Sequence, residues 1–167
     1  MISTALWSEG KPNEALSILL KYEEDTGFTN EDFSDEYLLH KVEVCQGNNR
    51  TPEAFEAYKV YFNRQEQISK DHLGTLIKLA RAGNRMNEVI ELTKNDTLNK
   101  KLQDSASLND ADIYELMGDV ALAGGENEAA IDHYKKSLEL DDSRIYINAQ
   151  IGKAYEWSNE PELAFQF

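Results

Sequence analysis

Met117 to Asp142 read MGDVALAGGENEAAIDHYKKSLELDD, with small residues where an isolated helix would gain from large ones. Apolar residues recur there every three or four positions, as they do on one face of a helix. The pair Gly124-Gly125 interrupts this pattern, and glycine is the residue that most readily ends a helix in the left-handed conformation. The stretch therefore predicts two short helices joined by a turn.

The same arrangement returns downstream as IGKAYEWSNEPELAF, starting at Ile151. Gly118 and Gly152 are 34 residues apart, and so are Ala130 and Ala164. A fixed period of this length is typical of proteins built from repeated helix pairs. We expect the two helices of each pair to touch at these small residues, because absent side chains let backbones approach. Gly118→Leu should then cost about 1–3 kcal/mol by overpacking.

Helical periodicity extends along the rest of the chain, and no segment shows a convincing period of two. Turn signals divide it at short intervals: Gly10-Lys11-Pro12, Gly47-Asn48-Asn49, Gly83-Asn84, Gly124-Gly125 and Ser158-Asn159. Pro12, Pro52 and Pro161 each stand two or three residues before an alanine, where we expect the first turn of a second helix. These turn and helix-start signals recur along the chain, which indicates a repeated unit.

The segment from Ala111 to Arg144 resembles a tetratricopeptide repeat. Tyr114 stands where that family often has Trp, Met117-Gly118 where it has Leu-Gly, and Ala130 and Tyr134 where it has Ala and an aromatic residue. The resemblance is most specific over residues 111–167 and weaker over 1–100. It implies an all-α fold, a right-handed α-solenoid of stacked antiparallel helix hairpins.

The resemblance also implies one domain over residues 1–167, with approximate units 1–34, 35–69, 70–110, 111–144 and 145–167. The earlier units are less regular, since Val89 and Ala130 are 41 residues apart. We expect the surplus to be a loop or a helix extension. The first and last units are incomplete. We therefore expect either that the sequence is an excerpt of a longer protein, or that another copy of the chain covers an uncapped end.

The composition excludes several classes of function. The 31 acidic residues against 17 basic ones, a net charge of −14, disfavour binding to nucleic acid. No signal peptide and no apolar run long enough for a membrane span are present, so we expect a soluble, cytoplasmic chain. Cys45 cannot form an internal disulfide and lies on an apolar stripe, where a buried, inert thiol is expected.

No catalytic, metal-binding or cofactor-binding group of residues emerges from the sequence. His40, His72 and His133 are too scattered for a metal site, and we expect them at the surface or in the groove. No Ser or Cys lies in a nucleophile motif, and no Gly-rich stretch follows a strand. We therefore expect a protein that is not an enzyme and has no cofactor.

In the resembled family the first helices of successive repeats line a concave groove that holds a peptide or a partner helix. The register places these residues there: Glu36, Leu39, Glu43, Lys78, Arg81, Asp112, Glu115, Asp119, Lys153 and Trp157. Carboxylates outnumber cations in this set, which favours a protein or peptide partner of basic or mixed charge and salt-sensitive association. One alternative is that these charges only form the solvent-exposed face of ordinary amphipathic helices. Another is that Trp157 packs against the next repeat.

These features favour a non-catalytic protein–protein interaction scaffold. One alternative is the substrate-positioning region of a larger enzyme, such as a glycosyltransferase, a sulfotransferase or a protease. The other is an assembly module that forms homo-oligomers through uncapped ends.

Overall fold

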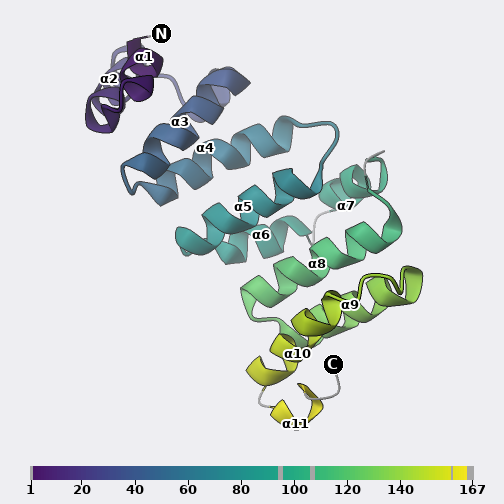
Figure 1. The fold of residues 1–167 in the computed structure, drawn as a ribbon. Coiled ribbons are helices and arrows are strands. Elements are labelled where there is room, and N and C mark those ends of the chain that lie inside the picture. The colour runs from purple at the N-terminus through teal and green to yellow at the C-terminus, as the bar shows by residue number, and fades with distance from the viewer. Residues whose placement is uncertain (1, 94–95, 106–107, 159, 165–167) are drawn as a thin grey trace. The chain divides into compact units, whose positions relative to one another are not determined.

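The computed structural model describes residues 2–93, 96–105, 108–158 and 160–164. All regular structure within these ranges is helical, so the all-α prediction is confirmed (Figure 1). None of these helices has the length and apolar character that crossing a membrane requires. The chain divides into two compact units, described below one at a time: unit 1 comprises residues 1–65 and 78–84, and unit 2 comprises residues 66–77 and 85–167.

Unit 1 consists of two helix pairs and a short connecting 3-10 helix. Its elements are α1 (Ile2–Ser8), α2 (Pro12–Thr26), η1 (Asn30–Asp32), α3 (Asp35–Gly47) and α4 (Thr51–Arg64), together with the last part of α5 (Lys70–Ala82). Arg64 ends α4 and donates hydrogen bonds to the carbonyls of Glu31 and Phe33, both at 2.7 Å, which ties α4 to the segment before α3. Pro12 and Pro52 lie in the first turns of α2 and α4, as predicted.

The core of unit 1 is apolar, and Cys45 belongs to it. Its side chain is almost completely buried, which confirms the sequence-based expectation. Burial raises the pKa of the Cys45 thiol to about 11. Because the thiolate is the reactive form, a thiol with such a pKa is unreactive at neutral pH.

In its described residues, unit 2 contains the first part of α5 and six further helices. These are α6 (Met86–Thr93), α7 (Asp96–Gln103), α8 (Asp110–Gly124), α9 (Asn127–Leu140), α10 (Ile147–Trp157) and α11 (Pro161–Ala164). α8 and α9 form the helix pair predicted from the 117–142 stretch. Gly125 ends α8 with a φ of 81°, in the left-handed region that glycine adopts without strain.

The surplus residues between Val89 and Ala130 include the helix α7. We expected a loop or a helix extension there, and the way in which α6 and α7 are joined falls on residues 94 and 95, outside the described residues. α6 has only 8 residues, against 14 in α9, and α7 follows as a second short helix. The Leu98 and Leu102 side chains of α7 are buried, so apolar burial stabilises the extra element.

Candidate protein-interaction surface

Gly118 lies directly beneath the ring of Tyr134. A Cβ atom at position 118 would come within 2.5 Å of the ring, closer than carbon atoms approach one another. The hydroxyl of Tyr134 donates a hydrogen bond to Asp119 at 2.8 Å, so the ring is fixed at both ends. The absent side chain of Gly118 thus makes room for an aromatic ring of α9. Ala130, one turn before Tyr134, is also fully buried.

The corresponding position in the next helix pair, Gly152, is less crowded. Among the described residues, a Cβ atom there would meet the backbone oxygen of Ala164 alone, at 3.6 Å, an ordinary van der Waals distance. The two glycines that share a place in the 34-residue period therefore have different surroundings.

A charged cluster joins three segments of unit 2 at the start of α8. Lys70, at the start of α5, lies 2.7 Å from Asp112 and 3.1 Å from Glu115. Arg144, in the loop between α9 and α10, lies 2.9 Å from Asp112 and 2.7 Å from Glu115. Its Nε atom donates to Asp141 at 2.9 Å. We call these five residues the Arg144 cluster.

The carboxylates of this cluster are held by polar groups on several sides. Asp112 accepts a hydrogen bond from the backbone N–H of Asn109, and Asn109 accepts one from the backbone N–H of Asp112, so together they cap α8. Glu115 also accepts a hydrogen bond from the hydroxyl of Tyr146 at 2.8 Å. The Arg144 side chain is only 10% exposed. Asp112, Glu115 and Arg144 are thus largely removed from water, whereas the side chains of Lys70 and Asp141 are 40% and 36% exposed.

The environment of Asp112 controls its protonation. Burial raises the pKa of its carboxyl, but the backbone hydrogen bond from Asn109 and the ion pairs with Lys70 and Arg144 outweigh burial and lower that pKa to about 2. Burial opposes the charge of Arg144, yet its hydrogen bonds to Asp141, Asp112 and Glu115 raise its pKa. These residues stay ionised at neutral pH.

We expect unit 2 to lose stability as the pH falls from about 4 to about 2. An unfolded aspartate titrates near pH 3.9, above the pKa of folded Asp112, so in this interval the unfolded state binds more protons. The contribution of ionised Asp112 to the stability of unit 2 is therefore fully present above about pH 4 and is lost as the pH falls to about 2. Thermal midpoints measured against pH should show a smaller acid loss in Asp112→Asn than in the unchanged chain. Asp71→Asn, at an exposed position of the same unit, is the control. Equal acid losses in all three proteins would contradict the expectation.

The structure places the predicted groove residues of unit 2 in two settings. Asp112, Glu115 and Asp119 lie on one face of α8, where each has an intramolecular partner. Lys153 and Trp157 lie one turn apart on α10 and are exposed, Trp157 to 56%. Their role in partner binding stays a prediction.

In unit 1 the predicted groove residues lie on two helices. Glu36, Leu39 and Glu43 share one face of α3, and all three are exposed. Lys78 and Arg81 lie in the last part of α5 and are also exposed. They too remain predicted contacts.

Sequence reasoning missed Tyr146 and the cations of the Arg144 cluster. Tyr146 immediately precedes α10, and its side chain is half exposed although its hydroxyl is bound to Glu115. Lys70 and Arg144 lie 74 positions apart in the sequence, and no local pattern joins them.

Ser3, His40 and Glu43 form the arrangement in unit 1 that comes closest to a catalytic one. The Oγ atom of Ser3 lies 3.0 Å from Nε2 of His40, and Glu43 lies 4.0 Å from Nδ1 of His40. The Ser3 hydroxyl also donates a hydrogen bond to the carbonyl of Ala15 at 3.0 Å, and the Ser3 side chain is buried, so the backbone of α2 engages this hydroxyl. The expectation that His40 lies at the surface was wrong, because it is buried as a structural link between α1 and α3.

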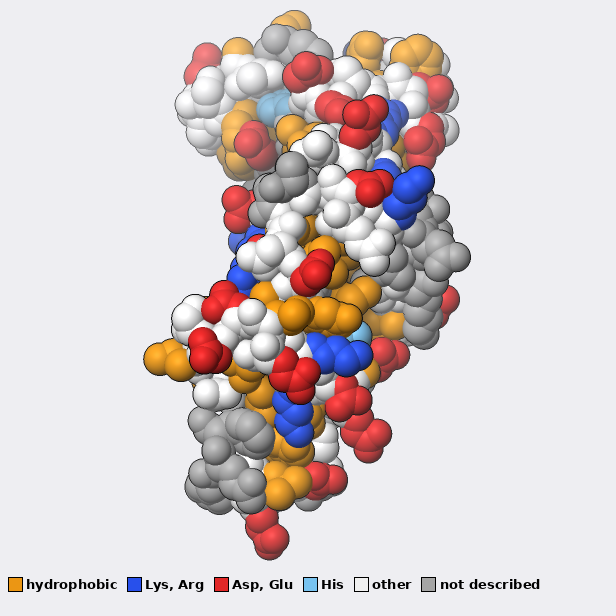
Figure 2. All heavy atoms as spheres, turned by 90° about the vertical axis from the view of Figure 1, so that its right-hand side faces the viewer, with side chains coloured by type: hydrophobic (Ala, Val, Ile, Leu, Met, Phe, Trp, Pro, Cys, Tyr) orange, Lys and Arg blue, Asp and Glu red, His pale blue; other side chains and the backbone are white. Residues whose placement is uncertain are grey.

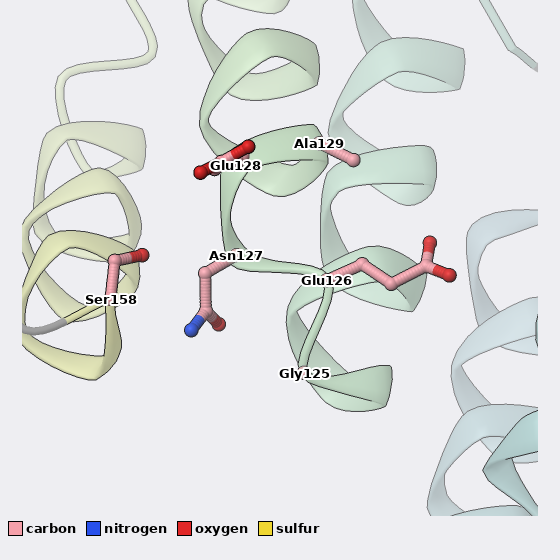
Figure 3. A pocket seen from close by; sticks show the side chains of 6 residues that line it. All are labelled: Gly125, Glu126, Asn127, Glu128, Ala129 and Ser158. Atoms are coloured by element: carbon pink, nitrogen blue, oxygen red, sulfur yellow. The ribbon is translucent and has the colours of Figure 1, made fainter.

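A shallow hollow of about 450 Å³ lies at the turn between α8 and α9. Its lining residues are Gly125, Glu126, Asn127, Glu128, Ala129 and Ser158 (Figure 3). Figure 3 shows the Asn127 side chain on the side of Ser158 and the Glu126 side chain pointing the other way. The first turn of α9 has no side-chain cap, but two carboxylates beside it oppose the binding of an anion. Among the described residues, no group of His, Cys, Asp and Glu side chains is arranged to hold a metal ion.

Comparison with known proteins defines the class of fold. No family model matches the chain, and no curated protein matches it. A crystal structure of MamA protein covers 99% of this chain and 83% of its own, with a TM-score of 0.55 and 21% identity. MamA 41-end from Desulfovibrio magneticus RS-1 covers 99% and 86%, with a TM-score of 0.57 and 16% identity. These likenesses support the all-helical, repeat-like fold expected from the sequence. At these identities the likeness concerns the fold alone.

Proposed function

We propose that the chain is a non-catalytic interaction scaffold that binds a peptide or a partner subunit across its first helices. The observation that carries the proposal is the exposed Trp157 on α10, with Lys153 one turn before it and the half-exposed Tyr146 ahead of the helix. Tryptophan and tyrosine are enriched among the residues that dominate binding energies at protein interfaces. The fold likeness to the MamA structures is consistent with a scaffold.

The proposed partner has basic or mixed charge. Arg144 and Lys70 already neutralise most of the charge of their carboxylate partners, so these acidic groups offer little to a partner. Glu36 and Glu43, on the exposed face of α3, remain available as acidic contacts. Contacts of this kind speed association and are weakened by salt.

The same proposal keeps the division into units 1–34, 35–69, 70–110, 111–144 and 145–167. The helix pairs α1–α2, α3–α4, α5–α6 and α10–α11 each fall within one of these ranges, and the pair α8–α9 starts one residue before 111, at Asp110. In this division α1, α3, α5, α8 and α10 are first helices, and the residues that we expect to contact a partner lie on α3, α5, α8 and α10.

Trp157→Ala should weaken partner binding about tenfold or more, because a central aromatic anchor is lost. We would select binders from a library of random short peptides on the whole chain and measure their affinities by fluorescence anisotropy at low and high salt. The matched control is Leu140→Ala, which removes a side chain of similar exposure, 54%, from the second helix α9. If the two variants lose equal amounts of affinity for the selected peptides, or if neither loses any, Trp157 is not part of the binding surface.

A further inference from the structure

The end of α2 and the segment that joins it to α3 carry a group of aromatic side chains in unit 1. The rings of Phe33 and Tyr37 stack with their centroids 4.0 Å apart, and both side chains are buried. The centroid of the Tyr22 ring, on α2, lies 6.1 Å from that of Phe33 and 5.9 Å from that of Tyr37. The ring of Phe28, which follows α2, lies 5.7 Å from that of Phe33. Tyr22 and Phe28 thus both pack against a buried pair of rings.

Tyr22 and Phe28 leave much of their own surface in solvent. They are 46% and 49% exposed, and Ile18, one turn before Tyr22 on the same face of α2, is 39% exposed. We call Ile18, Tyr22 and Phe28 the aromatic surface. Exposed apolar side chains that occur singly need no explanation, but a contiguous group with polar residues around it is typical of an interaction site.

Internal contacts hold the base of the aromatic surface in place. The hydroxyl of Tyr37 donates a hydrogen bond to Glu23 at 3.0 Å, and the ammonium of Lys41 lies 2.7 Å from the same carboxylate. Tyr22 itself has only two side-chain torsions to fix. Little entropy is therefore lost when a partner binds against these rings.

The surroundings of the aromatic surface are strongly acidic. Residues 22–36 include seven Asp and Glu residues and no Lys or Arg. Two cations from other helices contact this segment, and both are already paired, Lys41 with Glu23 at 2.7 Å and Arg64 with Asp35 at 3.1 Å. On the face shown in Figure 2, acidic and hydrophobic side chains predominate over cationic ones at the level of α1 and α2. This part of unit 1 therefore presents negative charge beside exposed rings.

Asp25 is the acidic residue best placed to act together with Tyr22. It lies three positions after Tyr22 on the same side of α2, is exposed, and makes no ion pair within the described residues. Lys21, one turn before Asp25, is likewise exposed, and no ion pair joins the two. Glu23, Glu24 and Asp25 lie in the last turn of α2, which contains no basic residue. A helix carries a partial negative charge at this end, so local stability favours cations there and disfavours acids. Departures from such a local rule are expected at functional positions.

We propose that the aromatic surface docks an arginine-bearing segment of a partner protein. The guanidinium of the arginine stacks on the ring of Tyr22 and donates hydrogen bonds to Asp25, while Phe28 and Ile18 contact apolar neighbours of the arginine. Arginine suits both contacts, because its planar group stacks on aromatic faces, pairs with carboxylates through two donors, and is less strongly hydrated than the ammonium of lysine. The Cβ atoms of residues three positions apart on a helix are about 5–6 Å from each other, so one guanidinium reaches both groups.

The test is a selection on the whole chain from a library of displayed random peptides, with counter-selection on Tyr22→Leu, which keeps apolar bulk and removes the ring. The peptides that remain should contain arginine next to apolar residues. Replacing that arginine by citrulline, its neutral isostere, should weaken binding to the unchanged chain about tenfold. The same replacement should weaken binding to Tyr22→Leu by a clearly smaller factor, because the stacking contact is already lost there.

A matched pair of substitutions tests the acidic part of the site. Asp25→Asn should weaken binding of the selected peptides about two- to fivefold and reduce its salt dependence. Glu24→Gln removes the same charge from the adjacent exposed residue, which lies on the other side of α2 from Tyr22, and should leave the affinity nearly unchanged. Circular dichroism checks that the variants are folded. Phe28→Ala, which lies outside the helices, provides a second test of the rings if Tyr22→Leu does not fold.

Four outcomes would overturn the proposal. They are the recovery of no peptide sensitive to Tyr22→Leu, the enrichment of peptides without arginine, equal losses in Asp25→Asn and Glu24→Gln, and self-association of the chain that Tyr22→Leu abolishes. The last outcome, seen by sedimentation, would assign the surface to a second copy. Peptides held here should bind Trp157→Ala normally, because the aromatic surface lies on α2 and the segment after it and not on α10. Failure of the first-helix surface and failure of this site are therefore distinguishable.

Discussion

Arg144→Met is expected to lower the free energy of unfolding of unit 2 by about 2–3 kcal/mol. Removing one partner of a buried ion pair costs about 3–5 kcal/mol, because the other partner keeps an uncompensated charge away from water. Here Lys70 continues to contact Asp112 and Glu115, and their side chains keep 13% and 16% exposure, so we expect the smaller cost. Urea denaturation followed by circular dichroism measures the change.

The control for this change is Arg85→Met in the same unit. Arg85 pairs with Glu88 on α6, and both side chains are about one-third exposed. Exposed pairs of this kind contribute about 0–1 kcal/mol. If Arg144→Met and Arg85→Met lower the free energy of unfolding equally, the Arg144 cluster stabilises unit 2 no more than an exposed ion pair does.

Gly118→Ala is expected to destabilise unit 2 by about 1–3 kcal/mol, although alanine is the better helix former. The new methyl group would lie 2.5 Å from the ring of Tyr134. The ring is completely buried, and its hydroxyl is bonded to Asp119, so it has little freedom to move away. The strain therefore exceeds the gain of about 1 kcal/mol in helix propensity. The larger Gly118→Leu should cost at least as much.

Gly152→Ala, in contrast to Gly118→Ala, should stabilise unit 2. Within the described part of the chain, the added methyl group would meet the backbone oxygen of Ala164 alone, at 3.6 Å, so the gain in helix propensity, up to about 1 kcal/mol, should remain. Thermal unfolding of the two single variants compares positions that occupy the same place in the period. Destabilisation at both positions, or at neither, would show that packing against Tyr134 does not distinguish them.

The helices and their turns could be predicted because they depend on local signals. Apolar spacing, the glycines at 124 and 125 and the early prolines each act within one or two turns of helix. The presence of α7 could not be predicted in this way. This helix depends on tertiary burial of Leu98 and Leu102, which no periodicity in a single repeat signals.

The partners of the candidate-site residues could not be predicted from register. Register places Asp112 and Glu115 on the first-helix face, but it does not show that Lys70 and Arg144 come from neighbouring hairpins to neutralise them. The setting of His40 was missed for a related reason, since its partner Ser3 lies on another helix. Long-range pairing of polar groups depends on three-dimensional placement, whereas periodicity reports only which face a residue occupies.

The Arg144 cluster has a practical consequence for anyone who would cut or recombine this chain. Its cations come from outside α8, Lys70 from the preceding helix pair and Arg144 from the loop that leads to the following one. The hairpin of α8 and α9 is therefore not a self-contained unit that could be exchanged alone. A graft of these two helices alone would carry Asp112 and Glu115 without their cationic partners. Such a graft must therefore include counterparts of Lys70 and Arg144.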